Sequence, residues 1–483
     1  MSGPGERAAP APERGCSIEA GWALVERDGG QELLRDATIV VRDGEIAEVV
    51  AGHRGGCDRR LDARGLLVLP GFISGHAHAA ISSPARGLIE SGRFYDRPLL
   101  LVDELDDDEL DVLTAYNVFE LLRSGATTTV EMSGSLRQAE SYARVARRWG
   151  VRTYLSAIVP SSERLFEIWY RDDDRVLRDS VSGTLAEIER ALAFGRRVNG
   201  SEDGRIRAQM GPHATDTHTP ETMAAILAGA RELGNGIHIH LAQRPREVEA
   251  VERMWGMRPA AWLEQLGILS EPLLAAHLLA ADPAVDFPIL ARHGVTFSHC
   301  PAMAGLLHGA AQPWPEALAA GLNVSLGTDQ LCNDCVENLK LATVHGQIRH
   351  AQLAAGAAVP LARPTIRDAV AAATRGGADG LRRPDLGRIA PGAKADLVAI
   401  DVSGPLVGTG SLPPDPLNNL LYANGLSVRH AMCDGRFTVR DGALAVDDEA
   451  RVVRAGAALA ERMWARLRAD GWFEAPPPAN SRG

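Results

Sequence analysis

Short apolar runs alternate with helical segments through the whole centre of this 483-residue chain. The runs have the length and flanking Gly and Pro residues of buried strands; they lie at 66–73, 127–132, 152–159, 206–210, 236–241, 273–278, 295–298 and 324–327. Between them, helix patterns cover 107–124, 137–149, 182–198, 220–233 and 245–266. Eight strands alternating with helices predict an α/β fold with a parallel sheet, and a closed (β/α)8 TIM barrel fits that count. A doubly wound open sheet is the alternative, but no glycine-rich phosphate loop follows any of the strands.

Both flanks of this centre carry β-branched runs around Asp-Gly turns, at Asp43-Gly44 and Asp434-Gly435. Such turns between apolar runs indicate β-hairpins. We therefore expect one small β-sandwich domain built from both chain ends. The predicted organisation is a disordered tail at 1–15, the β-sandwich domain at 16–65 and 384–447, the barrel at 66–383, and a C-terminal helix and tail at 448–483.

The composition excludes several classes of partner. The formal net charge of -11 argues against nucleic acid or an anionic membrane as a partner, because both require clustered cations. No apolar stretch is long enough to span a bilayer, and the first residues lack the apolar core of a secretory signal. The six cysteines are scattered and do not suggest a disulfide framework. A cytoplasmic location is the expectation.

Histidines gather at the predicted strand ends, where a barrel places its active site. Residues i and i+2 of a strand point to the same side, so His76 and His78 would project together. Seven of the 14 histidines lie at or just past a strand end: His76, His78, His213, His238, His240, His277 and His299. Asp329 follows the last strand. Imidazole and carboxylate groups are good ligands for zinc and similar ions, so this pattern indicates a metal site.

In its motifs the chain resembles the amidohydrolase superfamily, over roughly residues 17–447. The matching elements are Pro70-Gly-Phe-Ile-Ser-Gly-His-Ala-His78, Gly125-Ala-Thr-Thr-Thr-Val130, His238-Ile-His240, His277, Ser298-His-Cys-Pro301, Leu326-Gly-Thr-Asp329, Ala372-Ala-Thr-Arg-Gly-Gly-Ala378 and Gly387-Arg-Ile-Ala-Pro-Gly-Ala-Lys-Ala-Asp-Leu397. They occur in the family's order. The chain is most similar to the branch of aromatic deaminases and triazine hydrolases, which use one divalent metal ion.

The resemblance implies a role for each matching residue. The metal ligands would be His76, His78, His240 and Asp329, with zinc as the expected ion and iron(II) as the alternative. Asp329 would move the proton of the attacking water, and His277 would hydrogen-bond that water or the developing oxyanion. His213 matches a substrate-contacting position. His238, His299 and Cys300 are interpreted as structural residues.

The lysine content favours one metal ion over two. Two-metal members of the superfamily carry a carboxylated lysine at strand four or five. Only Lys340 and Lys394 are present here, and neither lies at that place in the sequence.

One position departs from the deaminase pattern. The deaminases of this branch have His-x-x-Glu at strand five, where the glutamate carries a proton to the substrate ring. Here the fourth residue is Gln243, which can form hydrogen bonds but cannot transfer a proton near neutral pH. We place Gln243 among the catalytic and substrate-binding residues, and we expect Arg86, Phe94 and Tyr95 from the loop after strand one to contact the substrate.

The predicted function is metal-dependent hydrolysis of a non-peptide carbon–nitrogen bond in an N-heterocyclic or related small molecule. Cleavage of an amide, urea or carbamate bond without ring protonation is the alternative that Gln243 favours. A non-catalytic barrel and a lyase are the other classes considered. The resemblance also implies a homodimer or a larger homo-oligomer.

Overall fold

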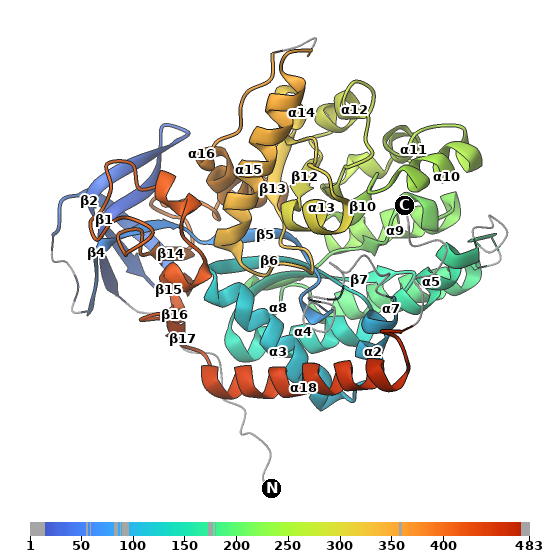
Figure 1. Cartoon of the computed structure of the whole chain (residues 1–483), viewed down its shortest axis with the longest axis horizontal. Coiled ribbons are helices and arrows are strands. Elements are labelled where there is room, and N and C mark those ends of the chain that lie inside the picture. Colours follow the sequence, from blue (N-terminus) through green and yellow to red (C-terminus); the bar gives the residue numbers. More distant parts are fainter. Residues whose placement is uncertain are drawn as a thin grey trace, which may run out of the picture.

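The structure is a computed structural model that describes residues 15–54, 57, 59–81, 86, 88, 96–171, 177–178, 180–356 and 360–474. The tail predicted at 1–15 lies outside the described residues except for Gly15. Figure 1 shows a central bundle of strands and helices, with a twisted sheet on one side formed by the two ends of the chain.

Parallel strands form the centre of the molecule. They are β5 (Phe72–Ala77), β6 (Ala126–Ser133), β7 (Arg152–Val159), β8 (Ile206–Ala208), β9 (Gly211–Pro212), β10 (Ile237–Leu241), β11 (Leu273–His277), β12 (Thr296–His299) and β13 (Asn323–Leu326). One parallel sheet has the order β5-β6-β7-β8, with β9 also paired to β7, and the other has the order β10-β11-β12-β13. Parallel bridges Ala77–Asp329 and Met210–Ile237 join the two sheets at both seams. The arrangement fits the predicted barrel, with β8 and β9 sharing one strand position.

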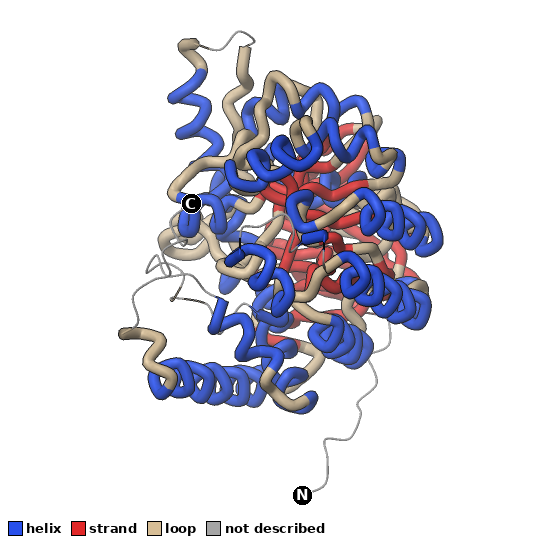
Figure 2. The backbone as a smooth tube through the Cα atoms, turned by 90° about the vertical axis from the view of Figure 1, so that its right-hand side faces the viewer, coloured by secondary structure: helices blue, strands red, loops and turns tan. Residues whose placement is uncertain are grey.

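Helices surround these strands, as Figure 2 shows. The longer ones are α3 (Asp107–Arg123), α4 (Leu136–Trp149), α5 (Ser162–Arg171), α7 (Val181–Val198), α9 (Pro220–Leu233), α10 (Pro245–Trp255), α15 (Cys335–Leu353) and α18 (Glu449–Ala469). Shorter ones are α2 (Asp96–Asp103), α8 (Ser201–Gly204), α11 (Pro259–Gln265), α12 (Asp286–Arg292), α13 (Pro301–His308), α14 (Trp314–Ala319), α16 (Ile366–Ala371) and α17 (Gly377–Gly380). The segment predicted as one helix at 245–266 is two helices, because Gly256 ends α10 in a left-handed conformation.

The two ends of the chain share one sheet of eight strands, in the order β17-β16-β15-β14-β4-β1-β2-β3. Its members are β1 (Cys16–Arg27), β2 (Gly30–Arg42), β3 (Glu45–Ala51), β4 (Arg59–Pro70), β14 (Leu397–Ile400), β15 (Val428–Cys433), β16 (Arg436–Arg440) and β17 (Ala443–Leu444). The two predicted hairpins are present, and Asp43, Gly44, Asp434 and Gly435 all have positive φ in their turns. The two chain ends therefore build this sheet together, while its division into a sandwich stays a prediction.

The first barrel strand begins later than the apolar run at 66–73 suggests. Residues 66–70 belong to β4, which pairs with β1 and β14 in the end sheet, and β5 starts at Phe72. The chain passes from one sheet to the other at Gly71, where an added Cβ would lie 2.3 Å from the Thr127 side chain. Residues 67–70 of β4 and all of β5 are buried, so hydrophobicity alone did not separate the two strands.

The C-terminal helix α18 runs along the outside of the barrel beside α3 (Figure 1). Its buried residues include Leu459, Met463 and Leu467, which join a small core with residues of α2 and α3. Among the described residues, no helix combines the length and the apolar character needed to cross a membrane.

Candidate active site

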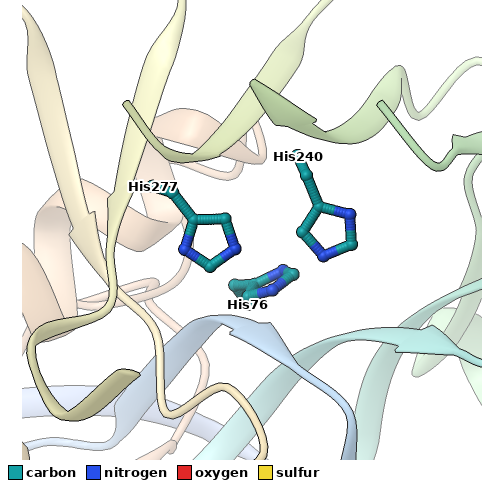
Figure 3. Close-up of side chains that lie close together, drawn as sticks. All are labelled: His76, His240 and His277. Carbon is teal, nitrogen blue, oxygen red and sulfur yellow. The ribbon is translucent and has the colours of Figure 1, made fainter. Parts of the chain in front are cut away.

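Imidazoles from three different barrel strands converge at the carboxyl-terminal end of the barrel. Figure 3 shows the rings of His76, His240 and His277 pointing toward a common centre from β5, β10 and β11. One nitrogen of each of these three rings lies within 4.8 Å of the others. His76, His78 and Asp329 form a second set at the same spacing, so the two sets share His76. This arrangement arises because each of these residues lies at or just after the carboxyl-terminal end of a buried barrel strand.

The rings of His78 and His240 are oriented as metal ligands. The Nδ1–H of His78 donates to the Met132 carbonyl at 2.5 Å, and the Nδ1–H of His240 donates to the His213 carbonyl at 2.8 Å. A carbonyl can only accept, so each Nδ1 carries the proton and each Nε2 is the nitrogen that carries the lone pair. Those two Nε2 atoms face one another at 3.2 Å. Tetrahedral zinc with Zn–N bonds of about 2.05 Å places two nitrogens about 3.3 Å apart.

Burial keeps these imidazoles neutral. It lowers the pKa of His78 to about 4 and that of His240 to about 3, in the latter case with help from the neighbouring His78. The pKa of His76 is also held well below its usual value, by burial and by the surrounding imidazoles. Neutral imidazole is the form that binds a metal ion.

His76 and Asp329 present buried polar atoms toward the same centre. His76 Nε2 and Asp329 Oδ2 have no hydrogen-bond partner among the described residues, and they lie 3.7 Å apart. A buried polar atom without a partner is costly, and a shared cation would satisfy both. The His76 ring is held from behind, since its Nδ1 lies 2.8 Å from Nε2 of His238. The donor set and its unpartnered atoms fit one divalent metal ion.

Asp329 and His277 have backbone conformations that few non-glycine residues adopt. Asp329 has a φ of 55° and His277 a φ of 84°. Asp329 Oδ1 accepts a hydrogen bond from the Gln330 backbone at 2.8 Å, while Oδ2 lies 3.7 Å from His277 Nε2. Burial raises the pKa of Asp329 to about 7. Such backbone outliers persist where the surrounding structure enforces them, and they are frequent at active sites.

A mostly apolar pocket opens beside this cluster, with a volume of about 50 Å³. His78, His240, His277 and Asp329 line its base together with His213, Gln243 and Gln330. The remaining lining residues are Ile81, Leu99, Ile158, Ser162, Leu165, Phe166 and Met303. The cluster therefore faces a small cavity.

Comparison with known proteins identifies the family. Residues 67–438 match the amidohydrolase family. The chain is 32% identical over 461 residues to a 5-methylthioadenosine/S-adenosylhomocysteine deaminase of Natronomonas pharaonis, covering 92% of this chain and 98% of that protein. The chain belongs to the amidohydrolase family. It is also 28% identical over 452 residues to a 5'-deoxyadenosine deaminase of Methanosarcina mazei, covering 90% and 95% of the two chains.

The fold of this amidohydrolase is shared with solved structures. The zinc complex of atrazine chlorohydrolase from Arthrobacter aurescens superposes with a TM-score of 0.78 at 21% identity, covering 92% of this chain and all of that one. The predicted resemblance to amidohydrolases is confirmed. The protein is a hydrolase that acts on a non-peptide carbon–nitrogen bond of an N-heterocyclic or related small molecule.

The structure brings most of the predicted site residues of this amidohydrolase together. The four candidate ligands, His277, His213 and Gln243 all lie at the pocket or the metal cluster, and the His213 and His240 rings are 4.9 Å apart. Lys340 and Lys394 lie elsewhere, paired with Glu337 on α15 and with Glu45 of the end sheet.

Arg86 is not among the residues that line this pocket. Its guanidinium donates two hydrogen bonds to Glu120, at 2.6 and 2.7 Å, beside a second cavity near Cys332 and Leu426. The predicted substrate contacts Phe94 and Tyr95 lie outside the described residues. Cys335 is buried in the main core and Cys332 is half-buried, and both are free thiols.

Several lining residues were not predicted. Gln330 directly follows Asp329, and its position next to a predicted ligand was a usable signal. Phe166 and Met303 come from helices that follow strands, and nothing in their local sequence distinguishes them from ordinary core residues. His238, interpreted from the sequence as a structural residue, contacts His76.

Proposed function

We propose that this amidohydrolase is a single-zinc aminohydrolase that releases ammonia from the purine ring of an adenine-type nucleoside. The observation that carries the proposal is the buried set of His76, His78, His240 and Asp329 beside a mostly apolar pocket. Within this set, His76 Nε2 and Asp329 Oδ2 have no hydrogen-bond partner among the described residues. The substrate class comes from the relatives of similar length, which are named as deaminases of adenosine derivatives.

The ligand set suits zinc, which would supply the positive charge that makes a water molecule nucleophilic near neutral pH. Asp329 accepts the proton of that water, because its Oδ2 lies at the centre of the cluster without another partner. His277 Nε2 lies 3.7 Å from that oxygen, where it holds the attacking water or the developing oxyanion. The apolar walls shield the reaction from bulk solvent.

The pocket must open further for a nucleoside. Its volume of about 50 Å³ is well below the several hundred Å³ of a typical ligand site. Lining side chains, such as those of Phe166 and Met303, are therefore expected to move when the substrate binds.

Gln243 supports a second candidate function. It lines the pocket, and its amide cannot deliver a proton to a ring nitrogen. Hydrolysis of an amide, urea or carbamate bond needs no ring protonation, and Asp329 alone can protonate the leaving nitrogen.

A substrate panel separates the two functions. Purified zinc-loaded protein is assayed against adenosine derivatives, aminotriazines, and small amides and ureas, with separate readouts for ammonia, amine and carboxylic acid. The first proposal expects the highest kcat/KM for an adenine-type nucleoside, with ammonia as the product. The highest kcat/KM for an amide or urea, with no ammonia released from adenosine derivatives, would replace it by the second candidate.

The variant Gln243→Glu tests whether the natural reaction requires protonation of the substrate ring. A positioned general acid contributes about 10²- to 10⁴-fold to a rate. If the natural reaction requires ring protonation, the wild-type residues already supply it, and the variant gains less than tenfold in ammonia release from an adenosine derivative. A larger gain, absent from the matched control Gln330→Glu at the same pocket, would favour the second candidate.

Two further properties are proposed. We propose a cytoplasmic location, and the family resemblance supports the proposal of a homo-oligomeric state.

A further inference from the structure

Gln312 lies behind the candidate catalytic residue His277, on the loop between α13 and α14. Its side chain is buried, with 1% of the residue exposed. Its amide makes three hydrogen bonds. Nε2 donates to the His277 backbone carbonyl at 2.8 Å, while Oε1 accepts from the Cys300 backbone N–H at 2.8 Å and from His299 Nδ1 at 2.5 Å.

The orientation of this amide is fixed by its partners. A flipped amide would aim its NH₂ group at the Cys300 N–H and its oxygen at the His277 carbonyl, so both contacts would become repulsive. The Gln312 oxygen therefore faces β12 and its nitrogen faces β11. The side chain joins the ends of two neighbouring barrel strands at the level of the active site.

His277 needs such support because its φ of 84° is unfavourable for a residue with a Cβ. A residue of this kind keeps its conformation only when its surroundings enforce it. The next peptide N–H, that of Leu278, is held by the Leu241 carbonyl of β10 at 3.1 Å. The Gln312 bond holds the same peptide unit from the β12 side. Rotation of this peptide would move the imidazole whose Nε2 lies 3.7 Å from Asp329.

We infer that Gln312 is a positioning residue for catalysis, which fixes the backbone of His277 and thereby the direction of its imidazole. The inference rests on the proposed function, in which His277 contacts the reacting water or oxyanion. Gln312 itself acts only through His277, so its loss is expected to lower kcat more than it changes KM.

The variant Gln312→Glu tests this through its pH profile. A protonated glutamic acid can reproduce all three bonds, with its hydroxyl donating to the His277 carbonyl. The ionised carboxylate has no donor, and it places negative charge against that carbonyl oxygen. The ratio of variant to wild-type kcat is expected to be near one at low pH and to fall at least tenfold as the carboxyl ionises, since a misplacement of about 1 Å can cost about 10²-fold. KM changes little over the same range.

The matched control is Gln209→Glu. Gln209 is also buried, and its Nε2 also donates to a backbone carbonyl, that of Asn235 at 2.8 Å, just before β10 begins. This end of the strand is opposite to the one that carries His240. The control variant is expected to keep a pH-independent kcat ratio. Thermal unfolding of each metal-free protein at each pH provides the second readout and checks that both variants are folded.

Two further variants decide between the possible outcomes. Gln312→Met removes all three hydrogen bonds and has a side chain of similar size. It is expected to lower kcat at every pH, so that the ratio of variant to wild-type kcat does not depend on pH. This variant also tests the inference if Gln312→Glu does not fold. Full kcat in Gln312→Met, or a flat ratio in folded Gln312→Glu, would overturn the inference. The variant His277→Asn tests the proposed function separately from the role of Gln312. Full kcat in this variant would show that His277 does not have the proposed catalytic role. A large loss of kcat would support that role.

Discussion

At the scale of single residues, His78 and His240 combine two properties that a metal ligand needs. Their Nδ1 protons are held by backbone carbonyls, and burial keeps both rings neutral. The HxH spacing on a strand and the strand-end positions were visible in the sequence, and they predicted these residues. The hydrogen bonds that fix each ring were not visible, because one acceptor, Met132, lies in β6 and the other, His213, directly follows β9.

The lowered pKa values predict how the metal-free protein responds to acid. The unfolded chain protonates His78 and His240 below their usual pKa of 6.5, whereas the folded chain protonates them only near their shifted values of about 4 and about 3. Their contribution to stability is therefore complete above pH 6.5 and is lost as the pH falls toward those values. We expect the melting temperature of the metal-free protein to fall between pH 7 and pH 5. The double variant His78→Gln/His240→Gln should show a shallower fall; an equal fall would contradict the assignment.

At the scale of elements, the site depends on the close approach of β5 and the segment after β13. Gly327 lies where an added Cβ would be 2.8 Å from both the His76 Cβ and the Cys300 Sγ. No larger residue fits there without separating the two chain segments. The Gly-Thr-Asp motif around Gly327 is visible in the sequence, but the reason for the glycine is a contact between residues far apart in the chain.

The variant Gly327→Ala is therefore expected to move His76 away from Asp329. Overpacking of this kind costs about 1–3 kcal/mol of stability, and displacement by about 1 Å can lower the rate about 10²-fold. The measurements are kcat and zinc affinity. Gly356→Ala is the matched control, since an added Cβ there meets nothing within 4 Å and α15 has already ended. Unchanged kcat and zinc affinity in Gly327→Ala would show that this contact does not shape the site.

The sequence predicted elements better than it predicted the boundary between the two sheets. The positions of β6, β7 and β10–β13 agree with the predicted strands to within about two residues. The apolar run at 66–73 predicts a single strand because the end of β4 and all of β5 are buried, and the hydrophobic pattern alone does not reveal a change of sheet at Gly71. The role of Gln312 was not predicted for a similar reason, because a glutamine in a loop belongs to no periodic hydrophobic pattern.

At the scale of the whole molecule, a buried ion pair connects the barrel to the end sheet. Arg152 opens β7, and its guanidinium donates to Asp396 at 3.2 Å and to Asp434 at 2.6 Å. Only 2% of the Arg152 side chain is exposed. Asp396 directly precedes β14, and Asp434 lies in the turn between β15 and β16. One side chain therefore joins two C-terminal segments of the end sheet to the barrel.

Replacement of this arginine should destabilise the protein strongly. Arg152→Met leaves the buried Asp396 without its cation, and breaking a buried pair in this way costs about 3–5 kcal/mol. We expect a clear decrease in melting temperature. The control Arg196→Met removes an exposed pair with Glu232 and should change the melting temperature little. Equal melting temperatures for the two variants would show that the buried pair does not hold the two parts together.

The metal content of the purified protein tests the central claim most directly. Elemental analysis of the wild-type chain is predicted to find about one divalent ion per chain, as expected for a site with one tetrahedral ligand set, and chelation is predicted to abolish hydrolysis until zinc is restored. The double variant His76→Ala/His240→Ala should bind no ion. Full activity of the wild-type protein after complete removal of divalent ions would contradict the account.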